Sequence, residues 1–138
     1  MLTPDVEAAI GELRNNYPNA TVISIEDGLG GAYILIDELG LGPPFREQHT
    51  WVGFHVTHGC PYADVYPHFV RGDLARADGQ PLGEGMGTGH VFPPEGVILP
   101  PGAMRRAAVQ ISRRSNNRHS LETPLIKLLK VLQWLNSR

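Results

Sequence analysis

Glycine and proline are concentrated in one long internal segment, residues 71–104, which holds eight of the 16 glycines and five of the 12 prolines. Glycine weakens helices and strands, and proline removes a backbone donor, so most of this segment is expected to be loop. A compact domain rarely carries so long an irregular stretch unless it is functional or packed by its own side chains. Because 41% of the 138 residues are hydrophobic, the rest of the chain can still form a core. We therefore expect one domain, residues 1–138, in which a long flap interrupts a small folded core.

A helix is predicted near each end of the chain, and each begins at a Thr-Pro pair. The hydroxyl of Thr3 or Thr123 can cap the helix. The proline that follows has no backbone N–H, but the first N–H groups of a helix have no hydrogen-bond partner within it, so nothing is lost. Apolar residues then recur at helical spacing. In the first helix, which should end before Pro18, they are Val6, Ala9, Ile10, Leu13 and Tyr17. In the last helix they are Leu125, Ile126, Leu128, Leu129, Leu132 and Leu135, with Lys127, Lys130 and Gln133 on the outside.

Four strands are predicted between the helices, at residues 20–26, 32–36, 51–57 and 68–70, because these runs are rich in β-branched and aromatic residues. The side-chain period of two places Trp51 and Phe54 on opposite faces of the third strand. Residues 107–111 are apolar again and should return to the core. The expected fold class is α+β: an N-terminal helix, a four-stranded antiparallel meander, the Pro/Gly-rich flap and a C-terminal helix. Four leucines of that helix should pack on the sheet, namely Leu125, Leu128, Leu129 and Leu132.

The charges are divided unevenly along the chain. Residues 1–104 carry 13 acidic and four basic side chains, whereas residues 105–138 carry eight basic and one acidic. This division predicts either ion pairs within the fold or a basic surface for an acidic partner, and both interpretations remain open. The candidate partner-binding residues are the five arginines that lie within 14 positions: Arg105, Arg106, Arg113, Arg114 and Arg118.

Two parts of the sequence resemble the ubiquitin-conjugating-enzyme (UBC) superfamily over roughly residues 50–136. The third predicted strand is followed by Pro61 and then by Tyr66-Pro67, which is similar to the strand, proline turn and Tyr-Pro signature of that family. The stretch Ser112-Arg113-Arg114-Ser115-Asn116-Asn117, followed by the leucine-rich helix with Trp134, resembles a prokaryotic branch that lacks the usual catalytic cysteine. The genes of that branch accompany ubiquitin-like proteins, activating enzymes and deubiquitinase-like peptidases.

The resemblance implies a UBC-like fold and a bacterial, cytoplasmic protein of a ubiquitin-like modification pathway, for example in antiphage defence. Its expected partners are a ubiquitin-like protein and the enzyme that activates it. The chain departs from the superfamily in having no His-Pro-Asn and no cysteine between Arg71 and the last helix. In the branch a histidine usually follows Ser-Arg, but here that position is Arg114, and His119 comes five residues later. A binding adaptor without the usual catalytic cysteine is therefore the first functional hypothesis.

A noncanonical acyl carrier is the alternative, and it would need Ser112 or Cys60 as its nucleophile. Cys60 is the only thiol, but it precedes Tyr66-Pro67, and it would need a nearby cation to lower its pKa. Ser112 lies where the resemblance places the family's nucleophile, and it would need His90 or His119 as a base. The catalytic candidates are thus Ser112, His119 and Cys60. The simpler interpretations are a buried loop cysteine and a serine bonded to nearby backbone.

A small metal- or nucleic-acid-binding domain is the third hypothesis. His55 and His58 could bind a metal together with His68 or His90, but they differ by three positions in a predicted strand. They should therefore point to opposite faces and not share a metal, unless the strand ends before Thr57. The glycine-rich run 83–89 lacks the Lys-Ser/Thr pair of a phosphate-binding loop, so no metal or cofactor is expected. The arginines have no interleaved aromatics, so nucleic acid is not an expected partner. No signal peptide or apolar run of about 20 residues is visible, which predicts a cytoplasmic protein without membrane contact.

Overall fold

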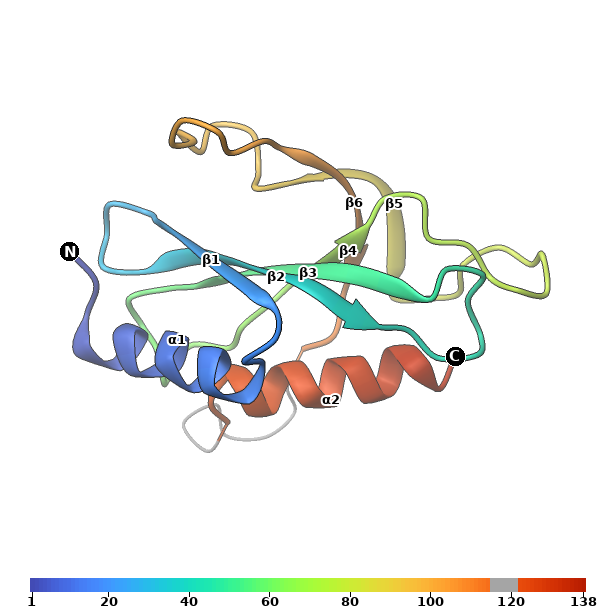
Figure 1. Ribbon diagram of the computed structural model, residues 1–138, viewed down its shortest axis with the longest axis horizontal. Coiled ribbons are helices and arrows are strands. Elements are labelled where there is room, and N and C mark those ends of the chain that lie inside the picture. Colours follow the sequence, from blue (N-terminus) through green and yellow to red (C-terminus); the bar gives the residue numbers. More distant parts are fainter. Residues whose placement is uncertain (115–121) are drawn as a thin grey trace.

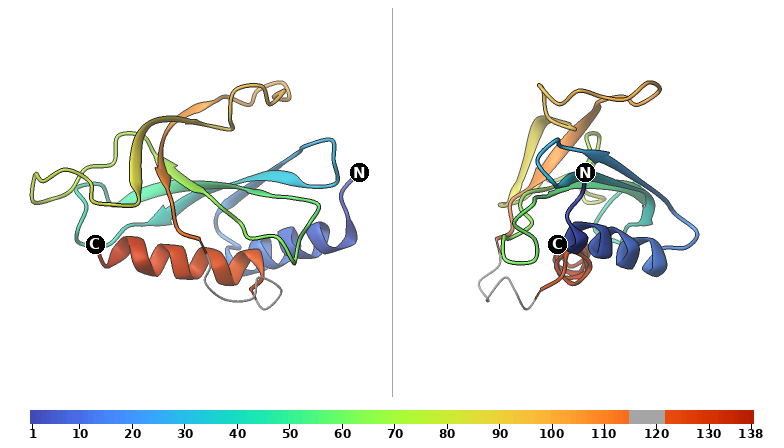
Figure 2. Two further views of the ribbon diagram at one scale, coloured as in Figure 1. Left: turned by 180° about the vertical axis from the view of Figure 1, so that it is seen from behind. Right: turned by 90° about the vertical axis from the view of Figure 1, so that its left-hand side faces the viewer.

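The computed structural model describes residues 1–114 and 122–138 as an α+β fold with two helices and one antiparallel sheet of six strands (Figure 1). Both helices lie against one face of the sheet, which we call the helix face, and the β5–β6 loop rises above the opposite face (Figure 2). The order of strands across the sheet is β1-β2-β3-β4-β6-β5. The elements are α1 (Pro4–Asn16), β1 (Thr21–Glu26), β2 (Ala32–Gly40), β3 (His49–Val56), β4 (His68–Arg71), β5 (Met86–Phe92), β6 (Arg106–Ile111) and α2 (Pro124–Asn136).

The sheet has two more strands than the four expected. β6 is the apolar run 107–111 extended by one residue, and it pairs with β4. β5 lies within the segment expected to be loop, and it pairs with β6 in spite of Gly87 and Gly89. The register shifts between Gly87 and His90, and Gly89 has φ +82°, a conformation that glycine adopts without strain. β5 was missed because its strand conformation depends on a partner strand rather than on its own side chains.

Both helices begin where the Thr-Pro pairs predict. The Thr3 hydroxyl accepts a hydrogen bond from the N–H of Val6, and the Thr123 hydroxyl accepts one from the N–H of Ile126, each at 3.2 Å. Thr123 also donates to the Glu12 carboxylate at 2.7 Å, which joins the beginning of α2 to the middle of α1. The two caps therefore fix where each helix begins, and the Thr123 cap also joins α2 to α1.

The rotation of α2 about its axis differs from the prediction. Leu128 is fully buried and Leu125 and Leu132 pack against the core, but Leu129 is 45% exposed and Ile126 is 40% exposed. Lys127, expected outside, is instead buried, and its ammonium lies 2.9 Å from the Asp64 carboxylate. The partner that makes this burial possible lies in the loop after β3, far away in the sequence. The expected packing through Leu129 was therefore wrong.

Apolar side chains form a separate cluster on each face of the sheet. Phe54 belongs to the large cluster beneath the helices, whereas Trp51 belongs to a smaller one on the opposite face, as the strand period predicts. The centre of the smaller cluster is Phe92 of β5, whose ring lies against Gly53 of β3. A Cβ atom at position 53 would lie 2.4 Å from that ring, so only glycine permits the contact. The β5–β6 hairpin thus closes over the face of β3.

His68 is a polar residue inside the larger cluster. Its side chain is fully buried next to the Phe54 ring, with 5.1 Å between ring centroids. Neither ring nitrogen has a hydrogen-bond partner in the part of the chain that the structure describes. Burial, reinforced by the Lys127 ammonium and partly opposed by Asp64, lowers the pKa of His68 to about 3. The imidazole is therefore neutral in the folded protein at any pH well above 3.

Replacing His68 by leucine is expected to remove part of the protein's acid sensitivity. Below pH 6.5 the histidine of the unfolded chain binds a proton that the folded chain, with a pKa of about 3, does not bind. Each pH unit below 6.5 therefore lowers the free energy of unfolding by about 1.4 kcal/mol. At about pH 4.5 the loss through this residue is about 3 kcal/mol, and it is absent at pH 7. Urea unfolding of wild type and His68→Leu at both pH values measures the difference.

The control for this experiment is His58→Gln, which removes an exposed histidine. It should retain the acid sensitivity of wild type, because the side chain that it replaces is exposed and lies outside the core. An equally steep loss of stability in His68→Leu and wild type would contradict the assignment.

Candidate functional site: a basic surface after strand β6

Two consecutive arginines directly after β6 are exposed and lie on aromatic rings. The guanidinium of Arg113 lies 5.0 Å from the centroid of the Trp134 ring, and that of Arg114 lies 3.9 Å from the Tyr66 ring. Arg138 lies 4.6 Å from the same Trp134 ring. We call Arg113, Arg114, Arg138, Tyr66 and Trp134 together the β6-exit surface. Its aromatic rings hold three cationic groups in defined positions without neutralising their charge.

The chain brings this surface together through contacts at the open end of the β5–β6 hairpin. The N–H of Ser112 donates to the carbonyl of Gly85 at 2.8 Å, which ties the end of β6 to the residue before β5. Gly85 has φ +83°, and a Cβ atom there would lie 3.2 Å from the Trp134 ring. Glycine at this position therefore allows both the turn and the close approach of α2. Arg113 follows directly and reaches the exposed side of the Trp134 ring.

The predicted arginine cluster is divided by β6 into two pairs with different surroundings. Arg105 donates to the backbone carbonyls of Pro94 and Val97, and Arg106 lies 3.2 Å from the Asp37 carboxylate. Arg113 and Arg114 have no ion-pair partner among the described residues. Arg105 and Arg106 thus interact with groups of the same chain, whereas Arg113 and Arg114 present their charge to solvent. Arg118 lies outside the described residues.

Ser112 is exposed next to this surface, and among the described residues its hydroxyl has no hydrogen bond to a histidine. Its hydroxyl accepts a hydrogen bond from the Gln110 side-chain amide at 3.3 Å. His90, one of the two expected bases, is opposite Ala108 in the β5–β6 ladder. Its Nε2 atom lies beside Gly87, which pairs with Gln110, and Gln110 rather than His90 is the hydrogen-bond partner of the Ser112 hydroxyl. His119, the other expected base, lies outside the described residues.

Cys60 is buried in the loop after β3, with only 8% of its surface exposed. Burial, together with the nearby Asp5 carboxylate, raises the pKa of the thiol. A catalytic cysteine needs the opposite shift, because the thiolate is the nucleophile. A small hollow of about 160 Å³ beside it is lined by residues of α1 and by the beginning of α2. This environment is that of a structural cysteine.

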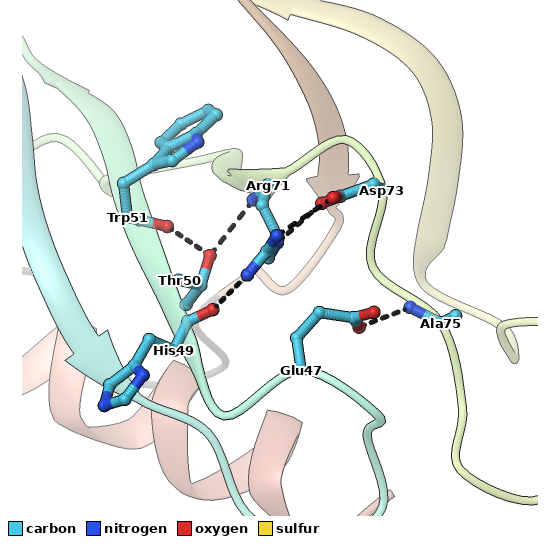
Figure 3. A network of polar contacts seen from close by, with 7 residues as sticks. All are labelled: Glu47, His49, Thr50, Trp51, Arg71, Asp73 and Ala75. Atoms are coloured by element: carbon cyan, nitrogen blue, oxygen red, sulfur yellow. Dashed lines mark hydrogen bonds and ion pairs between the residues drawn. The ribbon is translucent and has the colours of Figure 1, made fainter.

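A polar cleft of about 400 Å³ at the other end of β3 is built around Arg71 (Figure 3). Two guanidinium nitrogens donate to the Asp73 carboxylate at 2.5 and 2.9 Å, and the third donates to the His49 carbonyl at 2.8 Å. The Arg71 N–H donates to the Thr50 hydroxyl, which in turn donates to the Trp51 carbonyl at 2.6 Å. Three of the five guanidinium N–H groups are therefore bonded to the chain's own groups. These contacts join β3, β4 and the following loop.

A histidine–aspartate pair that the sequence did not predict lies at the β1–β2 turn. His55 Nε2 is 2.7 Å from the Asp27 carboxylate, and Tyr33 stacks on the imidazole with 4.0 Å between centroids. Although burial favours protonation, the hydrogen bonds from His55 and from two backbone N–H groups hold the pKa of Asp27 below its usual value. His58 is exposed in the loop after β3 and takes no part. The pair anchors the β1–β2 turn to β3.

The described residues offer neither a cluster of ligands for a metal ion nor a helix that could cross a membrane. No three histidine, cysteine, aspartate or glutamate side chains among them gather closely enough to hold a metal ion. Neither α1 nor α2, the two helices of residues 1–114 and 122–138, is long and apolar enough to cross a membrane.

Alkylation of Cys60 by iodoacetamide is expected to be slow in the folded protein at neutral pH. Its rate should rise with a midpoint above 9.0, the ordinary value for the thiol, because burial disfavours the thiolate. Intact-mass measurement of timed reactions between about pH 7 and 10 gives this midpoint. The same reaction in denaturant is the control and should show an ordinary thiol. A midpoint below about 8 in the folded protein would show an activated cysteine instead.

The chain matches no protein-family model, no curated protein and no solved structure. Its function must therefore be inferred from its own residues. Among the described residues, the β6-exit surface is the place where exposed, positioned charges gather without partners from the same chain.

Proposed function

We propose that the protein is a UBC-like member of a bacterial ubiquitin-like modification pathway that binds a ubiquitin-like protein or its activating enzyme without forming a covalent bond to it. The observation that carries this proposal is the exposed Arg113–Arg114 pair, held on aromatic rings directly after β6. The family resemblance places the nucleophile of a conjugating enzyme in the same region. A pair of fixed cations at that position is suited to binding an acidic protein surface.

The aromatic rings matter to the proposal because they reduce the entropic cost of binding. An arginine in solution loses about 2 kcal/mol of rotamer freedom when a partner immobilises it. Stacking on Trp134 or Tyr66 restricts the guanidinium before the partner arrives, and its edge N–H groups stay available for carboxylates. Arginine and aromatic residues are also the types enriched at the centres of protein interfaces.

An acyl carrier has less support from the same geometry. Cys60 is buried and its pKa is raised, whereas a thioester-forming cysteine needs a thiolate within reach of the partner's C-terminus. Ser112 is accessible, but no histidine among the described residues forms a hydrogen bond with its hydroxyl. A serine without a base is a poor nucleophile. These observations favour the adaptor over the carrier.

Replacing both Arg113 and Arg114 by alanine is expected to weaken binding of the ubiquitin-like protein encoded by the same genome at least tenfold. The Tm should fall by no more than about 8 °C, because two exposed cation–π contacts together contribute only about 1–2 kcal/mol. Biolayer interferometry measures the affinity and calorimetry the Tm. The lysine double variant keeps both charges but loses the planar stacking, so its affinity should be intermediate.

The matched control for this experiment is Arg46→Ala, which removes an exposed arginine outside the β6-exit surface. It should leave the affinity within about twofold of wild type, which separates a local contact from the effect of net charge. Equal binding by wild type and the double variant would contradict the proposal. So would a genome that encodes neither a ubiquitin-like protein nor an activating enzyme for it.

No covalent adduct is expected when the protein is incubated with the activating enzyme, the ubiquitin-like protein and ATP. Intact-mass measurement of wild type, Ser112→Ala and Cys60→Ala tests this expectation. A thioester at Cys60 would be cleaved by reducing thiols, whereas an oxyester at Ser112 would survive thiols and yield to hydroxylamine. An adduct that is lost in only one of the two variants, Ser112→Ala or Cys60→Ala, would contradict the adaptor proposal. The protein would then be an acyl carrier, and the residue replaced in that variant would be its nucleophile.

A further inference from the structure

The loop between β5 and β6, residues 93–105, overhangs the face of β1 and β2 that is opposite the helices (Figures 1 and 2). Two hollows lie beneath it, of about 270 and 600 Å³, and Tyr33 lines both of them. We call the two hollows together the overhang groove. The first is mainly apolar, with walls that include Ile23, Ile25, Leu35 and Met104. The second is acidic, with Glu26, Asp27 and Glu95 in its walls.

The overhanging loop is held in place by Arg105. Its Nε donates to the Pro94 carbonyl at 3.2 Å, and another guanidinium nitrogen donates to the Val97 carbonyl. The Glu95 carboxylate lies 3.7 Å from the same group. One end of the loop is thereby fastened to the other, and the base of the loop rests on Phe92 in the core. The groove is a preformed feature, which lowers the cost of filling it.

Apolar side chains on both walls of the groove are exposed to solvent. Ile23 of β1 is 40% exposed, and Met104 and Ile98 of the loop are 77% and 89% exposed. A single exposed apolar side chain is ordinary, but several around one hollow indicate a binding surface. Burial of apolar area yields about 25 cal/mol per Å², so an apolar side chain placed between these walls would be stabilised.

The charges at the groove differ between its two hollows. Glu26 and Glu95 are exposed carboxylates at the acidic hollow, and the Met1 ammonium already lies 2.8 Å from Glu26. Ion pairs between exposed groups are weak, so a cation from a partner can replace these contacts. At the apolar hollow, Arg106 is engaged by Asp37 and Arg105 by the loop itself. The groove therefore favours an apolar group at one end and a cation at the other.

From these observations we infer that the overhang groove binds an extended segment of a partner protein in which apolar side chains adjoin a lysine or arginine. The groove follows β1 from Ile23 to Glu26, a length of about 10 Å, which is three residues of an extended chain. This binding site is separate from the β6-exit surface and has the opposite charge preference. It does not depend on the function proposed for that surface.

Selection from a phage library of random dodecapeptides on the immobilised full-length protein tests this inference. The enriched peptides are expected to contain apolar residues next to lysine or arginine. One enriched peptide, synthesised with a fluorescent label, should bind at least fivefold more weakly to Ile23→Gln in an anisotropy titration. The double variant Glu26→Gln with Glu95→Gln should also weaken binding, and more so at low salt, where the charges are less screened.

Leu129→Gln is the matched control, because Leu129 on α2 is exposed to a similar degree as Ile23 but faces away from the groove. It should bind the peptide as wild type does. Met104→Gln is a second groove variant on an exposed loop side chain, and it keeps the test decisive if Ile23→Gln folds poorly.

Enrichment of acidic peptides, no enrichment, or equal binding by all variants would overturn the inference. Loss of binding only in the Arg113→Ala, Arg114→Ala variant would also overturn it, as would self-association that Ile23→Gln abolishes.

Discussion

The ring of Phe92 occupies the space that a side chain at position 53 would need, and the position of the β5–β6 hairpin depends on this contact. Gly53 allows the β5–β6 hairpin to close over the face of β3, where Phe92 also meets Trp51 at 6.0 Å and Phe69 at 5.3 Å between centroids. An aromatic ring buried in this way contributes several kcal/mol, which is enough to hold a glycine-rich strand with little intrinsic preference for the sheet. The hairpin then has two ends with different environments. Its loop end overhangs β1 and β2, and its open end meets α2.

Those parts of the fold that are determined locally could be predicted from the sequence. The two Thr-Pro pairs place both helix starts, because a capping hydroxyl and a proline act on their nearest neighbours. β5 could not be found in this way, since its residues favour loops and only the pairing with β6 makes them a strand. The burial of Lys127 likewise depends on Asp64, whose position follows from the folded chain and not from the local pattern.

The sequence predicts which charged residues form the candidate site, but it does not predict how they are arranged in space. The sequence indicates five clustered arginines, but Tyr66 and Trp134 come from other parts of the chain and carry no local sign that they will lie under Arg114 and Arg113. The His55–Asp27 pair was missed for the same reason. The one available signal was Asp27 at the start of a glycine-rich turn, where an aspartate commonly accepts backbone N–H groups.

The uneven division of charge along the chain has a physical explanation in β6. Arginines before and at the start of this strand lie against groups of the same chain, with Arg105 on loop carbonyls and Arg106 on Asp37. Arginines after it stack on rings, which carry no net charge, so their positive charge is not cancelled. The first pair contributes to the shape of the overhang groove, and the second contributes an electrostatic field. A protein with a formal net charge of only −2 can in this way present an acidic groove at one end of a hairpin and a basic surface at the other. The length of β6 from Arg106 to Ile111 is about 17 Å, and it separates the two surfaces. The Debye length at physiological salt is about 8 Å, so each surface can attract its own partner.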